Sequence, residues 1–292
     1  MSTSLGLRAS HIALIAKRHA KYSIRGGSGL VFALASLLTG LLIAQIFIGI
    51  VEQVQEITQM DVAKALESAS ETSAKVIQFA TGGDDERLSK FLAEKPTLIS
   101  AFLLVLMFVL PYLVSLGAFN QTSGDISSKG LRYLLLRTER SNIFVGRFLG
   151  TLIFVSASLV FLMIIVTMYL SFKFTLYDTS EVVLWMTWGT AAIILYSIPC
   201  IALFSWISCS IDSPFGSLVL GQLVFGALPI LVFIGKRYTE HAKYGNFILP
   251  SGFKFFLFHP DIKWLLVGIL AMLAFTVLFL FLGMRSFQKR DL

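Results

Sequence analysis

The chain has 292 residues, of which 56% are hydrophobic and only 14% are charged. Its mean hydropathy of +0.79 excludes a water-soluble globular protein, because such a fold could not bury this much apolar surface. The formal net charge of +7 does not indicate nucleic-acid binding, since no aromatic-basic recognition module accompanies it and the basic residues lie beside apolar segments.

The apolar residues form long blocks separated by short polar stretches, which predicts one all-α integral membrane domain over residues 1–292. Six blocks reach or approach the roughly 20 residues that a helix needs to cross the hydrocarbon core. These predicted spans are Gly29–Val51, Leu98–Phe119, Val145–Phe172, Val182–Ile207, Ser217–Ile234 and Trp264–Met284. The first is too long for the apolar region of a signal peptide, so we expect it to remain as an anchor.

The N-terminal segment, residues 1–27, is basic and predicts an amphipathic helix. Ile12, Ile15 and His19 share one face of a helix over 10–24, while lysines and arginines occupy its other faces. A basic helix of this length next to a span lies in the membrane interface. The alternative is a disordered basic tail.

Residues 52–97, between the first two spans, are polar and acidic, but apolar residues recur in them at near-helical spacing. The Thr81-Gly82-Gly83-Asp84 stretch would reverse the chain, and Asp84 would cap a second helix. We therefore expect a helical insertion on the outer side of the membrane, which either extends the spans as a stalk or packs as a small cap.

The connection between the second and third spans, residues 121–144, contains a short predicted helix at Gly130–Arg137. Leu131, Leu134 and Leu135 form its apolar face, and basic residues surround them. A helix held parallel to the membrane between two spans can pass force from a docked soluble partner to both. The alternative is an amphipathic linker that binds no partner.

The last connection, residues 235–263, is apolar and aromatic, but Pro250, Gly252 and Pro260 interrupt any full crossing. This pattern predicts a re-entrant or interfacial element, in which surrounding protein shields irregular backbone. The alternative is a surface loop that contributes to an aromatic belt.

Lysine and arginine clusters in the N-terminal segment, in residues 121–147 and in the C-terminal tail fall on one side if six helices alternate. By the positive-inside rule both termini are cytoplasmic, and the acidic 52–97 segment is outside. One connection departs from this rule, because residues 235–263 carry five basic side chains on the outer side. These are Lys236, Arg237, Lys243, Lys254 and Lys263.

The residues predict no enzyme and no cofactor of the chain's own. No glycine-rich loop ends in Lys-Ser or Lys-Thr, as a phosphate-binding loop does. The four histidines and two cysteines lack metal-ligand spacing. The predicted spans carry almost no ionisable side chains, which disfavours a proton- or ion-coupled carrier. Any energy for transport must therefore come from elsewhere.

The region from Asp125 to Gly150 resembles the ABC-2 type permeases, the six-span membrane subunits of ATP-binding cassette (ABC) transporters. The matching positions are Asp125, Gly130, Leu131, Arg132, Leu134, Leu135, Arg140, Gly146 and Arg147. The chain departs from the family pattern where Lys129 replaces a common Glu, where Thr138 replaces a common Pro, and where no Thr follows Gly130. Residues 12–25 resemble the family's N-terminal elbow helix, with His19 where Glu is frequent.

The resemblance implies a permease subunit of an exporter in the bacterial inner membrane, forming a homodimer or heterodimer. ATP and Mg²⁺ would bind to separate cytoplasmic ATPase subunits. The residues expected to couple to that ATPase are Asp125, Gly130, Leu131, Arg132, Leu134, Leu135, Arg137 and Arg140. Family membership does not fix the substrate.

A second hypothesis is a mechanical or scaffolding subunit that moves no substrate. Such a subunit would transmit ATP-driven motion through residues 52–97 to a partner protein outside the cell. The enlarged outer segment is the sequence feature that favours it.

Overall fold

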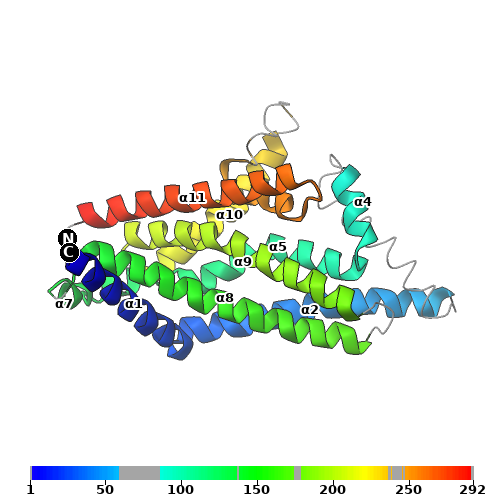
Figure 1. Ribbon diagram of the computed structural model, residues 1–292, viewed down its shortest axis with the longest axis horizontal. Coiled ribbons are helices and arrows are strands. Elements are labelled where there is room, and N and C mark those ends of the chain that lie inside the picture. Colours follow the sequence, from blue (N-terminus) through cyan, green and yellow to red (C-terminus); the bar gives the residue numbers. More distant parts are fainter. Residues whose placement is uncertain are drawn as a thin grey trace.

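The computed structural model describes residues 2–58, 86–136, 138–173, 179–235, 238, 245 and 247–290. Within these ranges the chain forms helices and no β-strand, which confirms the predicted all-α fold. The longest helices run side by side along the long axis, and both chain termini lie at the end of the bundle that carries α7 (Leu131–Leu135) (Figure 1). We call this the α7 end.

Six of the described helices are long and apolar enough to cross a membrane, as predicted. They are α2 (Gly27–Thr58), α5 (Thr97–Ala118), α8 (Arg140–Lys173), α9 (Thr179–Ser210), α10 (Pro214–Gly235) and α11 (Ile262–Lys289). Several extend beyond the predicted spans, because hydropathy marks the lipid-embedded part of a helix whereas backbone hydrogen bonding continues into polar residues. Six such helices are typical of a multi-pass membrane protein.

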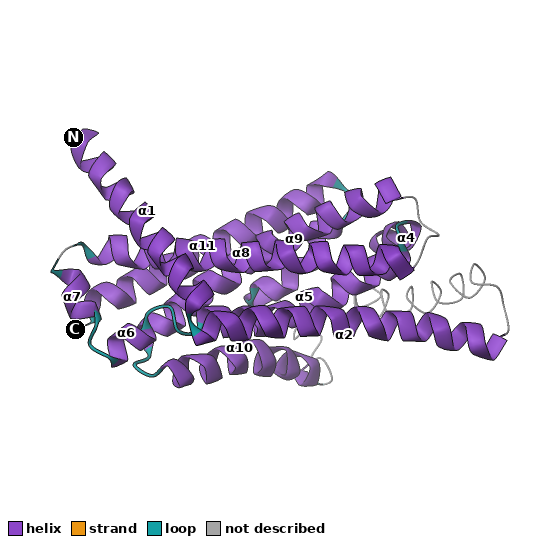
Figure 2. Cartoon of the chain, turned by 90° about the horizontal axis from the view of Figure 1, so that it is seen from below, coloured by secondary structure: helices purple, strands orange, loops and turns teal. Residues whose placement is uncertain are grey.

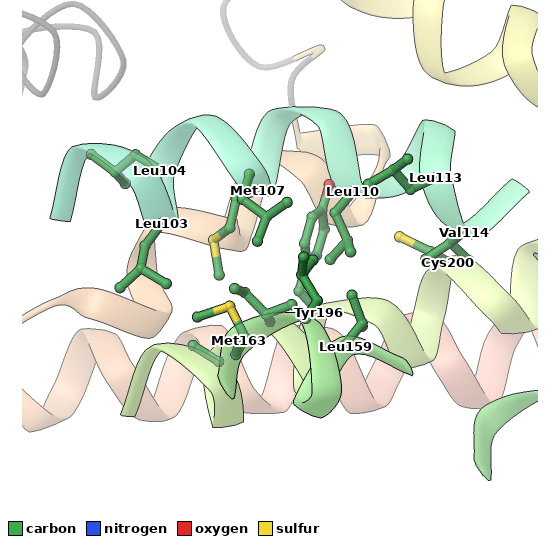
Figure 3. Close-up of a cluster of buried hydrophobic side chains, with 14 of the residues drawn as sticks. Leu103, Leu104, Met107, Leu110, Leu113, Val114, Leu159, Met163, Tyr196 and Cys200 are labelled. Carbon is green, nitrogen blue, oxygen red and sulfur yellow. The ribbon is translucent and has the colours of Figure 1, made fainter. Parts of the chain in front are cut away.

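Helices α5 and α9 form the centre of the bundle. In each, 78% of the most apolar window is buried, against 25% in α10 and 22% in α11. Met107, Leu110 and Val114 of α5 face Tyr196 and Cys200 of α9 in this core (Figure 3). The outer helices keep exposed apolar faces, which suits helices whose solvent is lipid.

The remaining elements lie at the two ends of the bundle. Helix α1 (Ser2–Arg25) runs obliquely to the long helices (Figure 2). Helix α6 (Ser123–Ser127) and α7 connect α5 to α8. Helix α4 (Glu86–Glu94) and the 3-10 helix η2 (Pro250–Phe258) lie at the opposite end, which we call the α4 end.

The predicted outer segments are described in part. Helix α2 continues without a break from Ile50, where its apolar window ends, to Thr58. The turn predicted at residues 81–84 lies outside the described residues, as do Lys236, Arg237 and Lys243. Element η2 begins at Pro250 and ends before Pro260, and its depth in the membrane stays a prediction.

Candidate functional site: the α6–α7 segment

An ion pair fixes α6 on the long helix α8. The Arg147 guanidinium pairs with the Asp125 carboxylate and donates a second hydrogen bond from Nη1 to the carbonyl oxygen of Gln121, at 2.8 Å. Arg147 is only 5% exposed, and a buried charge is tolerated only when it is paired and hydrogen-bonded. The structure thus brings together two of the positions on which the sequence resemblance rests, which lie 22 residues apart.

Helix α9 holds the start of α6 from the other side. The backbone N–H groups of Thr122 and Ser123 both donate to Ser208 Oγ, at 2.9 and 3.0 Å. Ser205 Oγ donates to Gln121 Oε1 at 2.6 Å. The first N–H groups of a helix have no partner within it, so Ser208 caps α6 across the fold. Sequence analysis missed both serines, because no local pattern marks a partner 85 residues away.

The predicted apolar face of α7 packs largely against the chain itself. Leu131 is 1% exposed and lies in a small cluster with Ile143, Phe144, Cys209 and Phe287. Leu134 and Leu135 are half-buried against the same cluster. Gly130 is the residue that precedes the first turn of α7. Leu131 therefore anchors the connection between α5 and α8 to the rest of the chain.

A different set of side chains, on α7 and on Leu136 directly after it, faces outward. Tyr133 is 77% exposed and Leu136 is 85% exposed, and Arg132 is exposed beside them. Sequence analysis did not single out Tyr133 or Leu136, because a helix of five residues is too short for periodicity to show which face the fold covers. Together, Arg132, Tyr133 and Leu136 form what we call the outer α7 face.

Arg140, at the start of α8, binds the end of α11. Its Nη1 donates to the backbone carbonyl oxygens of Phe287, Gln288 and Arg290, at 3.2, 2.9 and 2.7 Å. The last carbonyls of a helix lack partners within it and carry partial negative charge, so a guanidinium is well placed there. Arg290 in turn pairs with Asp212. Arg137, the remaining predicted coupling residue, lies outside the described residues.

Helix α1 packs closely on the same part of α8. A Cβ added at Gly146 would lie 2.7 Å from Ile15 Cγ2, and one at Gly150 would lie 2.7 Å from the Ala16 carbonyl oxygen. His19 Nε2 lies 3.1 Å from Thr151 Oγ1. Burial, together with the nearby charge of Arg147, lowers the pKa of His19 to about 4. His19 is therefore neutral at physiological pH.

The α6–α7 segment is held in place at several points. The outer α7 face offers a tyrosine, a leucine and an arginine on a segment that polar contacts tie to α8 and α9, while the apolar cluster around Leu131 joins it to Phe287 of α11. Within the described part of the chain, no three metal-ligating side chains come together.

We compared the chain with known proteins. It matches no protein-family model and no curated sequence.

Proposed function

We propose that this chain is the membrane-spanning permease subunit of an ATP-driven exporter of the ABC-2 type, located in the bacterial inner membrane. Separate cytoplasmic ATPase subunits would bind ATP and Mg²⁺ and would dock on the α7 end. The observation that carries the proposal is the outer α7 face, with Tyr133 exposed on a short helix and Leu136 exposed at its end, while Leu131 packs this helix against three long ones.

The anchoring gives the proposal its mechanical basis. A push on the α6–α7 segment would reach α8 through the Asp125–Arg147 pair and α9 through Ser208. From α8 it would pass to the end of α11 through Arg140. Because these contacts join charged or buried polar groups, breaking them is costly. Motion of a docked ATPase would therefore move long helices rather than bend a loose loop.

Two further assignments belong to this proposal. Both termini would be cytoplasmic, because the α7 end also carries the basic N-terminal and C-terminal segments. A second permease copy, identical or similar, would complete the transporter, and lipid would cover the remaining apolar faces of the outer helices. Nucleic acid is not among the proposed partners.

One observation favours the second candidate, a mechanical subunit with a partner outside the cell. Helix α2 continues beyond its apolar window to Thr58 as one helix, so displacement of the apolar part would be carried outward. Helix α4 is held to the bundle by buried Leu88 and Leu92 and by the edge-to-face contact of Phe91 with Trp185. Co-purification of an additional outer protein would favour this candidate.

The test of ATPase docking is co-purification of an ATP-hydrolysing partner with the double variant Tyr133→Ala/Leu136→Ala. If these side chains are buried interface anchors, each truncation costs about 2 kcal/mol, and the yield of complex should fall by more than about tenfold. Phe215→Ala is the matched control, since Phe215 is 72% exposed at the start of α10. An unchanged yield in the double variant, with normal membrane insertion, would remove the outer α7 face as the docking site.

A further inference from the structure

Helix α1 turns a basic face away from the bundle. Its sequence contains no acidic residue, and Lys17, Arg18, Lys21 and Arg25 are all exposed. At 3.6 residues per turn, these four side chains fall within an arc of about 100° around the helix. We call them the α1 basic face. The opposite side of the helix, which carries His19, packs against α8.

The chain itself does not neutralise the α1 basic face. In the part of the chain that the structure describes, no carboxylate pairs with any of its four basic groups. Lys17 and Lys21 stand four residues apart, as do Lys21 and Arg25, and like charges at this spacing on a helix repel each other. Anions from outside the chain would relieve this repulsion.

Two long helices place α1 at the boundary of the hydrocarbon. Helix α2 follows α1 directly, and its apolar window begins at Gly27. On α8, no charged residue follows Arg147 before Lys173. His19 lies against Thr151, about one turn beyond Arg147. Helix α1 thus lies at the level where charged residues end on α8 and the apolar window begins on α2, which in a bilayer is the level of the lipid headgroups.

The outer side of α1 also carries apolar side chains. The helix runs obliquely to the long helices (Figure 2), and Tyr22 and Ile24, on the two sides of the α1 basic face, are 66% and 64% exposed. At the edge of a bilayer such side chains enter the apolar region while the basic groups stay among the headgroups. A leaflet that contains anionic phospholipids offers negative headgroups and apolar chains at the same level, whereas an acidic soluble protein would match the charge alone.

We propose that the α1 basic face binds anionic phospholipids of the leaflet at the α7 end, in preference to zwitterionic ones, through their negatively charged headgroups. The charge of the face and the apolar side chains beside it are both matched by such a lipid. This site does not depend on an ATPase, so its failure would leave the coupling proposal untouched.

The test measures which lipids lie next to α1. The full chain with Tyr22→Cys is labelled there with a fluorophore and is reconstituted in phosphatidylcholine vesicles with increasing fractions of nitroxide-labelled phosphatidylglycerol or nitroxide-labelled phosphatidylcholine. The native Cys200 and Cys209 are buried, so they should not react. The comparison label is at Phe215→Cys, an exposed position where the apolar window of α10 begins.

We expect phosphatidylglycerol to half-quench the label at position 22 at a fraction at least about fivefold lower than phosphatidylcholine needs, since one basic residue contributes about this factor at an anionic membrane. At position 215 the two lipids should quench to about the same extent. Equal quenching by the two lipids at position 22 would overturn the proposal and would leave the α1 basic face to a partner other than lipid.

Charge substitutions assign the signal to the α1 basic face. Lys17→Gln/Lys21→Gln should raise the half-quenching fraction of phosphatidylglycerol at position 22 by about fivefold or more, whereas Lys17→Arg/Lys21→Arg keeps both charges and should not. Arg285→Gln/Lys289→Gln is the matched control, because it removes two exposed charges from α11 at the same end of the bundle. A preference that survives Lys17→Gln/Lys21→Gln, or that falls equally in the control, would also overturn the proposal.

Discussion

At the residue scale, Arg147 and its partners hold the α6–α7 segment in place. Removing one partner of a buried ion pair costs more than replacing both with apolar groups, because the remaining charge stays buried. Asp125 is half-exposed, so we expect Asp125→Asn to lower stability by only about 1–3 kcal/mol. The double variant Asp125→Asn/Arg147→Met should recover part of this loss. Thermal unfolding of purified protein measures both, and an Asp125→Asn variant as stable as wild type would contradict the assignment.

His19 gives the second prediction at this scale. Its pKa of about 4 in the folded chain is below the ordinary value of 6.5, so the folded state binds fewer protons than the unfolded state between these values. The contribution of neutral His19 is fully present above pH 6.5 and is lost as the pH falls toward 4. Thermal stability of wild type should therefore fall more steeply over this interval than that of His19→Gln. Equal slopes would show that folding does not lower the pKa of His19.

At the element scale, the close contact between α1 and α8 depends on small residues. A side chain at Gly150 would collide with the carbonyl oxygen of Ala16 and with Cβ of His19. Both atoms belong to the backbone of α1 or are bonded directly to it. We expect Gly150→Ala to push α1 away from α8 and to increase tryptic cleavage at Lys17 and Arg18. Gly226→Ala is the control, since its added carbon would lie 3.7 Å from Tyr112 Oη, an ordinary contact. Equal cleavage in the two variants would contradict the close packing.

The elements also show how far sequence reasoning reaches. The six long helices were predictable, because the need to satisfy backbone groups in lipid converts apolar length directly into helix. The outward side of α7 was not, because it depends on the cluster around Phe144 and Phe287, whose members come from distant helices. The sequence named Arg147 and Asp125 only as two positions of the resemblance and did not predict that they pair. No sequence pattern indicated a role for Ser208.

At the scale of the whole molecule, the structure separates two ends with different chemistry. The α7 end gathers the buried Arg147 pair, the Arg140 contacts and the outer α7 face. The α4 end carries an apolar cavity lined by residues of α4, α9, α11 and the end of η2. An apolar core built on α5 and α9 connects them (Figure 3). The proposed docking of an ATPase therefore concerns the α7 end alone.

The most direct test of the central claim is site-specific photo-cross-linking in native membranes. A photoreactive residue in place of Leu136 should form an adduct with a protein that contains an ATP-binding cassette, identified by mass spectrometry. The same residue in place of Phe215, also exposed, should not. The account predicts this adduct at position 136 and its loss when Tyr133→Ala is added. Absence of an ATPase adduct at position 136, or equal ATPase adducts at both positions, would contradict the account.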